Sequence, residues 1–312
     1  MTYIVFFLIS FILSSISIFF LRKIGKEYGF YDLASRDPLK IHKTPISYLG
    51  GLAIFLVFLV LFLLFSYFKE FLNCKIGGVI LAGFFPFLIG FWDDFKWKKT
   101  GVTTNKKFLF LILFSFLATI ILMDNGIKIQ FFPGIWLGIF LTFFYVLGLI
   151  NAVNFEDGID GLAGGLVAIS LIGFIILSLV SGNNLALTIS LVLFGAILGF
   201  LFFNSPPAKI FMGDSGAYFL GFVLVVLAAI FSEPYNITSV LGPIFIIGLP
   251  IFDTGLAIIR RLSQRKSPFF GDREHFYDKM IQSGFSTEKT VLISYLWQLI
   301  LVIFGVVIYL YV

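Results

Sequence analysis

A series of long apolar stretches, separated by short polar ones, limits what this chain can fold into. The stretches fall at about residues 2–21, 48–68, 71–91, 107–123, 132–150, 161–181, 185–203, 216–232, 238–258 and 290–311. Each approaches the ~20 residues that an α-helix needs to cross a bilayer. Because the hydrocarbon core offers no water to backbone polar groups, such stretches favour helices. The sequence predicts an all-α polytopic membrane protein of about ten transmembrane helices, in one domain over residues 1–312.

The composition agrees with a membrane protein. The chain is 59% hydrophobic and only 12% charged, whereas a soluble domain carries about 25% charged residues. Residues 3–21 have no basic segment before them and no small-residue cleavage site, so we interpret them as a retained first helix. The single Cys74 rules out an internal disulfide, and no Cys/His cluster suggests zinc.

Basic residues indicate how the helices are oriented. All of the 22 Lys and Arg residues except Lys69, Lys75 and Lys128 fall in alternate loops, beginning with the loop after the first helix, or beside them. The positive-inside rule places those loops in the cytoplasm. We therefore expect both termini to be extracytoplasmic, in a multi-pass protein of the cell inner membrane.

The acidic residues share that side. All of the 17 Asp and Glu residues except Glu70, Asp124 and Glu233 fall at the predicted cytoplasmic face. The positive-inside rule does not require this, because acidic residues contribute little to topology. A face rich in both charges favours a site for a phosphorylated substrate and its metal, and nothing suggests nucleic acid.

The most unusual polar segment is Asn151-Ala-Val-Asn154-Phe-Glu-Asp157-Gly-Ile-Asp160-Gly161. Carboxylates at membrane depth cost about 2.5–3.5 kcal/mol each, which suggests a function. Residues three apart drift around a helix, so these side chains converge only if the helix ends within the segment. Their oxygen atoms suit Mg²⁺ or Mn²⁺. A hydrated loop with capping aspartates is the alternative.

Other polar groups recur at the same predicted face. Asp93 and Asp94 close the third helix and point about 100° apart if the helix continues, so one can bind metal while the other takes a basic partner. Asp214 precedes a helix, which leaves a simple capping role open. Asp253 lies within an apolar run, seven residues before Arg260, so a structural ion pair is an alternative.

These motifs together resemble the polyprenyl-phosphate N-acetylhexosamine-1-phosphate transferases. The resemblance runs from Tyr31 to about Gly284 through five blocks. The blocks are Asp32…Lys40-Ile-His42-Lys43…Gly50-Gly51; Gly90-Phe-Trp-Asp93-Asp94 with Lys107; the Asn151–Gly161 segment; Phe211-Met-Gly-Asp214-Ser-Gly216; and Asp253 with Asp272…His275.

The resemblance implies Mg²⁺-dependent transfer of a sugar 1-phosphate from a UDP-N-acetylhexosamine to a polyprenyl phosphate at a cytoplasmic site. It implies catalytic roles for Asp93, Asp94, Asp157, Asp160 and His275; substrate-binding roles for Lys43, Lys107, Asn151, Asn204, Phe211, Asp253 and Asp272; and metal ligation by Asn154 and Asp214. Within this assignment, Phe211 would stack on uracil, and the two lysines would meet phosphates.

One departure bears on the substrate. Many family members carry a multi-histidine run where this chain has His275-Phe-Tyr277-Asp278. We therefore expect UDP-N-acetylglucosamine as the donor, and the branch that uses UDP-N-acetylmuramoyl-pentapeptide is the alternative. A cation-coupled transporter is the non-enzyme alternative, although its acidic residues should lie near mid-bilayer. The sequence leaves a homodimer open.

Overall fold

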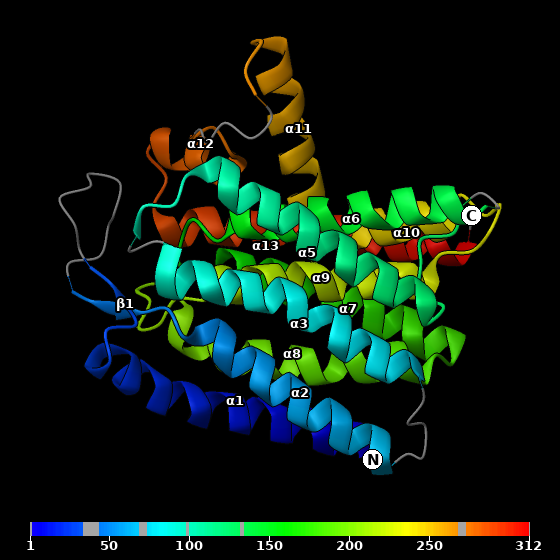
Figure 1. The fold of residues 1–312 in the computed structure, drawn as a ribbon, viewed down its shortest axis with the longest axis horizontal. Coiled ribbons are helices and arrows are strands. Elements are labelled where there is room, and N and C mark those ends of the chain that lie inside the picture. Colours follow the sequence, from blue (N-terminus) through cyan, green and yellow to red (C-terminus); the bar gives the residue numbers. More distant parts are fainter. Residues whose placement is uncertain are drawn as a thin grey trace.

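The computed structural model describes residues 2–33, 44–68, 74–97, 100–131, 134–267 and 273–311. They form a bundle of roughly parallel and antiparallel helices with one short hairpin at its edge (Figure 1). The helices are α1 (Thr2–Glu27), α2 (Gly50–Phe68), α3 (Cys74–Trp92), η1 (Asp93–Trp97), α5 (Thr104–Asp124), α6 (Ile135–Glu156), α7 (Leu162–Ser181), α8 (Asn184–Asn204), α9 (Gly213–Phe231), α10 (Thr238–Ile247), α11 (Leu249–Ser263), α12 (Phe276–Gln282) and α13 (Thr287–Tyr311). Strands β1 (Tyr31–Asp32) and β2 (Ile46–Ser47) pair antiparallel.

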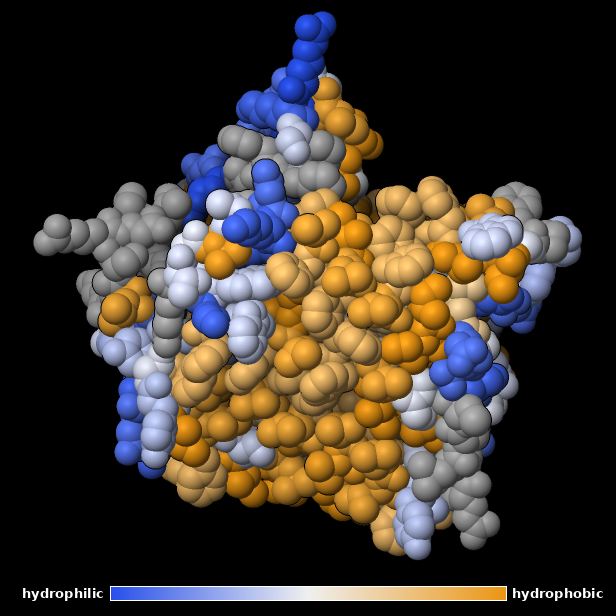
Figure 2. Space-filling model, in the orientation of Figure 1, coloured by the Kyte–Doolittle hydropathy of each residue, from blue (hydrophilic) through white to orange (hydrophobic). Residues whose placement is uncertain are grey.

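The predicted membrane architecture agrees with these helices. Within the described residues, nine helices are long and apolar enough to cross a bilayer, and the bent pair of α10 and α11 raises the count to ten if it is one span. On the face drawn in Figure 2, a broad apolar surface covers the middle of the bundle, and polar residues lie toward its two ends. The chain is therefore a multi-pass membrane protein.

The apolar run at 238–258 does not form the single helix that its hydropathy predicts. It divides at Gly248, and α10 and α11 meet at 90°. Gly248 has a φ of 60°, which glycine adopts without strain, and Pro250 begins the second helix, where its missing N–H is tolerated. As a result α11 leaves the bundle at a steep angle (Figure 1).

Helix α9 is the centre of the molecule. Its apolar window is 83% buried, compared with 17% for α1, and it packs against α2, α3, α6 and α10. The central position fixes Asp214, which lies in its first turn. The hairpin and α12 lie at one end of the bundle, and both chain termini lie at the other (Figure 1).

Candidate active site

The start of α9 is held by a carboxylate from another helix. Asp94 accepts hydrogen bonds from the backbone N–H groups of Asp214 at 3.1 Å and Ser215 at 3.0 Å. It is only 3% exposed. The first N–H groups of a helix lack partners within the helix, and an anion there also meets the positive end of the helix dipole. Asp94 therefore caps α9, the role that the sequence left open for Asp214 itself.

Asp93 faces a different partner from its neighbour. Its Oδ1 lies 2.5 Å from Lys107 Nζ, at the start of α5, and its carboxyl group also interacts with that of Asp214. Asp93 and Asp94 lie in the π-helical turn η1, which follows α3. The predicted divergence of the two carboxylates is thus present: one takes a lysine, and the other takes a helix start.

Asn154 completes this cluster from α6. Its Nδ2 donates to Asp214 Oδ1 at 3.1 Å. Helix α3 can approach the start of α9 closely because Gly90 has no side chain; a Cβ there would lie 2.5 Å from the Asp214 carbonyl oxygen. We call Asp93, Asp94, Lys107, Asn154 and Asp214 the polar cluster.

Helix α6 continues beyond the predicted run at 132–150 and ends within the Asn/Asp segment. Its last residue is Glu156, and Gly161 has a φ of 80° in the following turn. Asn151 and Asn154 therefore belong to the last helical turns, whereas Asp157 and Asp160 belong to the turn between α6 and α7. Because the helix ends at Glu156, its periodicity does not set the directions of Asp157 and Asp160.

Two predicted residues brace this turn. Asp160 Oδ2 accepts from the N–H of Ala208 at 2.8 Å. Asn204 accepts from the N–H of Gly161 at 3.0 Å and donates to the Ile210 carbonyl at 2.8 Å. Contact of either residue with substrate remains a prediction, as it does for Asn151, whose Nδ2 donates to the Leu147 carbonyl at 2.6 Å.

The Phe211 segment is joined to the first hairpin through its backbone. The N–H of Phe211 donates to the Ser47 carbonyl at 2.8 Å, and its carbonyl accepts from the N–H of Gly50 at 3.0 Å. The Phe211 ring is partly exposed, as stacking on a base requires. Lys43, just before this hairpin strand, lies outside the described residues, and so does Asp272.

A second group of buried charges lies where α11, α12 and the end of α6 meet. His275 Nδ1 lies 2.5 Å from Asp253 Oδ2, and Asp253 Oδ1 accepts from the N–H of Phe276 at 2.9 Å. Arg261 Nη2 lies 3.5 Å from His275 Nε2. His275 therefore lies between a carboxylate and a guanidinium, with Nδ1 facing Asp253 and Nε2 facing Arg261.

This arrangement differs from the ion pair considered for Asp253 from the sequence. Arg260 Nε instead lies 2.8 Å from Glu274 Oε2. Both residues lie on α11, and the segment 274–276 gives each a separate partner: His275 and Phe276 for Asp253, and Glu274 for Arg260.

Two buried charged residues in this group could not be predicted from the sequence. Arg261 and Glu156 are each only 1% exposed. Arg261 reads as one of several basic residues in a cytoplasmic loop, and Glu156 as one more acid in the Asn/Asp segment. Neither burial follows from the local pattern, because it results from the packing of α11 and α12 on α6.

The polar cluster is compatible with Mg²⁺. Among the described residues, no three His, Cys, Asp or Glu side chains are grouped to hold a metal. Mg²⁺, however, is usually held by one or two carboxylates together with substrate phosphates and waters. The carboxyl groups of Asp214 and Asp93 with the Asn154 amide fit that mode, because a half-turn of the amide presents its oxygen instead of its nitrogen.

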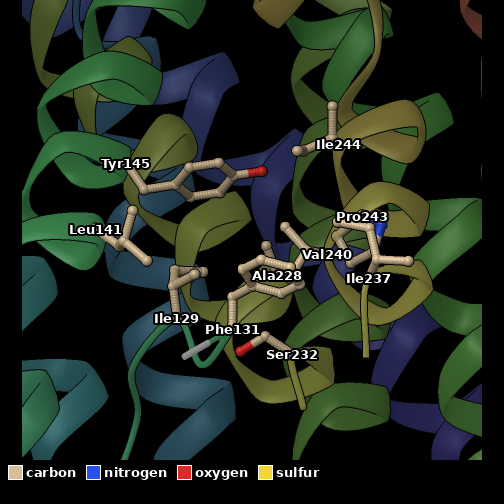
Figure 3. Close-up of a pocket in the computed structure, with 10 residues that line it drawn as sticks. All are labelled: Ile129, Phe131, Leu141, Tyr145, Ala228, Ser232, Ile237, Val240, Pro243 and Ile244. Atoms are coloured by element: carbon tan, nitrogen blue, oxygen red, sulfur yellow. The ribbon is translucent and has the colours of Figure 1, made fainter. Parts of the chain in front are cut away.

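A separate cavity of about 220 Å³ lies away from the polar cluster. Figure 3 shows its lining, which comes from the segment before α6, from α6 itself, and from the end of α9 and α10. Its walls are apolar apart from the Tyr145 and Ser232 hydroxyl groups. Because Asp214 lies in the first turn of α9 and this cavity touches the far end of that helix, the cavity lies toward the opposite end of the bundle.

The fold and the polar cluster define a polytopic membrane protein with a charged site at one end of its bundle. The family model described as Glycosyl transferase family 4 matches residues 76–232. The chain belongs to this family and is a phosphotransferase, which confirms the resemblance inferred from its motifs.

Named relatives cover most of the chain. The probable undecaprenyl-phosphate N-acetylglucosaminyl 1-phosphate transferase of Bacillus subtilis (strain 168) is 32% identical over 92% of this chain and 81% of its own length. The decaprenyl-phosphate N-acetylglucosaminephosphotransferase of Mycobacterium tuberculosis (strain CDC 1551 / Oshkosh) is 31% identical over 82% of this chain and 70% of its own. The phospho-N-acetylmuramoyl-pentapeptide-transferase of Limosilactobacillus fermentum is 30% identical over 70% of each chain.

Proposed function

We propose that this enzyme transfers an N-acetylhexosamine 1-phosphate from a UDP-sugar to a polyprenyl phosphate at the cytoplasmic face of the inner membrane. The observation that carries the proposal is the polar cluster, in which the Asp93 and Asp214 carboxyl groups, the Asn154 amide and Lys107 meet at one end of the bundle. The names of the Bacillus and Mycobacterium relatives specify transfer of N-acetylglucosamine phosphate to prenyl phosphates, which supports the same chemistry.

In the proposed reaction, an oxygen of the lipid phosphate attacks the phosphorus that carries the sugar. The bond from that phosphorus to the bridging oxygen breaks, and its electron pair leaves with UMP. The lipid then carries a pyrophosphoryl sugar. A phosphate monoester has a second pKa of about 6, so the nucleophile is mostly ionised at pH 7 and needs no base. A covalent aspartyl-phosphate intermediate is the alternative route.

The side chains then act mainly by positioning and by charge. Lys107 balances the negative charge of the phosphates, and Asp93 holds its ammonium group in place. Asn154 and Asp214 would hold Mg²⁺, which neutralises charge on the diphosphate during transfer. Asp94 keeps Asp214 in register by capping α9.

The test is UMP release by the purified protein with undecaprenyl phosphate, Mg²⁺ and a panel of UDP-sugars. Asp214→Ala should abolish release, because it removes the carboxylate that Asn154 and Asp93 contact. Asp124→Ala is the matched control, since Asp124 ends α5 at the opposite end of the bundle. UMP release at the wild-type rate by Asp214→Ala would contradict the proposed site.

We propose UDP-N-acetylglucosamine as the donor. The His275 and Tyr277 side chains are almost fully buried. They therefore offer few exposed contacts to a bulky lactyl-peptide group. Replacing residues 271–278 with a multi-histidine segment should change donor preference more than Mg²⁺ dependence. Turnover of UDP-N-acetylmuramoyl-pentapeptide without any turnover of UDP-N-acetylglucosamine would refute this assignment.

A further inference from the structure

Two tyrosines from the last elements of the chain hold the turn that carries Asp157 and Asp160. The Tyr277 hydroxyl of α12 donates to the Phe155 carbonyl at 3.2 Å. The Tyr295 hydroxyl of α13 donates to the Gly161 carbonyl at 2.6 Å. We call residues 157–160 the acidic turn; the two bonded carbonyls flank it.

Both tyrosines approach the backbone directly. A Cβ at Gly158 would overlap the Tyr277 hydroxyl group, and a Cβ at Gly165 would overlap that of Tyr295. Glycine permits such close approach because it carries no side chain. Burial raises the pKa of the Tyr277 phenol, and the Asp278 carboxylate beside it adds to the effect, so the phenol keeps its proton.

The turn is also anchored by one apolar side chain. Ile159, between the two aspartates, is buried in a small cluster apart from the main core. The other members of the cluster are Leu162, Leu166, Tyr277 and Val291, with Leu249, Ile281 and Tyr295 packed around them. Asp157 and Asp160 remain partly exposed. The burial of Ile159 against α12 and α13 therefore fixes which way the acidic turn faces.

We propose that Tyr277 and Tyr295 are positioning residues that set the placement of the acidic turn for catalysis. This inference rests on the proposed function. Phosphoryl transfer depends almost entirely on positioning and charge stabilisation, and a misplacement of about 1 Å lowers the rate strongly. The tyrosines act through the backbone of the turn and through Ile159.

The first test removes only the hydroxyl groups. Tyr277→Phe and Tyr295→Phe keep the rings, and each should lower kcat about fivefold, the equivalent of one ordinary hydrogen bond. The Mg²⁺ concentration for half-maximal rate should rise, because Asn154 is adjacent to Phe155, whose carbonyl Tyr277 binds. Tyr309→Phe is the matched control on α13, since Tyr309 packs against Phe231 far from the turn.

The second test uses the close contact at Gly158. Gly158→Ala should lower kcat more than Tyr277→Phe, because its methyl group collides with the phenol. Tyr277→Ala removes the phenol and with it the collision. The kcat of the double variant should therefore equal that of Tyr277→Ala alone. Simple additivity of the two losses would contradict direct contact between these residues.

Amide hydrogen exchange tests the same idea without any activity. Exchange in peptides covering 155–161 should be faster in Tyr277→Phe and Tyr295→Phe than in the wild type, and unchanged in Tyr309→Phe. Unchanged exchange, or a lower melting temperature with unchanged kcat and Mg²⁺ dependence, would overturn the positioning role. A wild-type enzyme that releases no UMP from any UDP-sugar would instead refute the proposed function, while exchange would still report on the contacts.

Discussion

At the residue scale, Asp93 and Asp94 show how adjacent carboxylates acquire separate tasks. Asp94 accepts two backbone N–H groups at the start of α9, whereas Asp93 binds Lys107. The first contact joins two helices, and the second leaves a charged pair beside Asp214. Mutation should therefore affect the two positions in different ways.

Asp94→Asn should lower both stability and activity. The neutral amide offers one acceptor in place of two and loses the favourable interaction with the helix dipole, a loss of about 1 kcal/mol. Asp214 then loses its register. Thermal unfolding in detergent and UMP release measure the two effects, and Asp124→Asn is the control. An unchanged melting temperature would show that the cap contributes nothing.

Asp93→Asn should lose activity at every pH. If Asp93 removed a proton from the lipid phosphate, raising the pH above the second pKa of that phosphate, about 6, would restore the activity of the variant. We expect no such restoration, because the wild-type nucleophile is already ionised and Asp93 instead holds Lys107. Rates measured between about pH 6 and 9 decide the question, and substantial recovery at high pH would assign Asp93 as the base.

Part of this site could be predicted from residues alone. The acidic residues gathered at one predicted face indicate a site. The offset of about 100° between Asp93 and Asp94 indicates that the two have different partners. The partners could not be predicted, because Asp94 caps a helix start 120 residues away in the chain. The same limit applies to Arg261, whose burial depends on the direction of α11.

At the element scale, the break between α10 and α11 depends on one polar side chain of α13. Gln298 is fully buried. It accepts from the N–H of Leu249 at 2.8 Å and donates to the carbonyls of Ile246 at 2.8 Å and Ile247 at 3.1 Å. Backbone groups freed by a broken helix need such partners at membrane depth.

Gln298→Leu should therefore destabilise the protein by about 1–3 kcal/mol, because it leaves buried backbone groups without partners. Activity should fall as well, since α11 carries Asp253. Thermal unfolding and UMP release measure both effects. Gln264→Leu, at the exposed end of α11, is the control. Equal stability of the two variants would assign the break to Gly248 and Pro250 alone.

Hydropathy could not predict this break, because the run at 238–258 is mostly apolar, with Asp253 as its one charged residue, and long enough to span. The local signals were Gly248 followed by Pro250, together with a glutamine in an otherwise apolar last helix. Helices without such interruptions, such as α7 and α8, agree with their predicted runs to within a few residues.

At the scale of the whole molecule, the distribution of charge in the sequence corresponds to the two ends of the bundle. The hairpin and α12 share one end, and the termini share the other (Figure 1). The polar cluster lies at the hairpin end, because the Phe211 segment just before α9 is bonded to Ser47 of the hairpin. That grouping was predictable because alternate loops of a bundle of spanning helices must meet on the same side. The basic bias of the loops then predicts which end faces the cytoplasm.

Cysteine substitutions on either side of α8 test this orientation. Ser181 and Ser205 are both exposed, at opposite ends of the bundle. With Cys74 replaced by Ser, a membrane-impermeant thiol reagent should label Ser181→Cys in intact cells. Ser205→Cys should be labelled only after permeabilisation, because it lies at the charged end of the bundle, which the basic loops predict to be cytoplasmic. The opposite labelling pattern would place the polar cluster outside the cell and remove the donor from the proposed reaction.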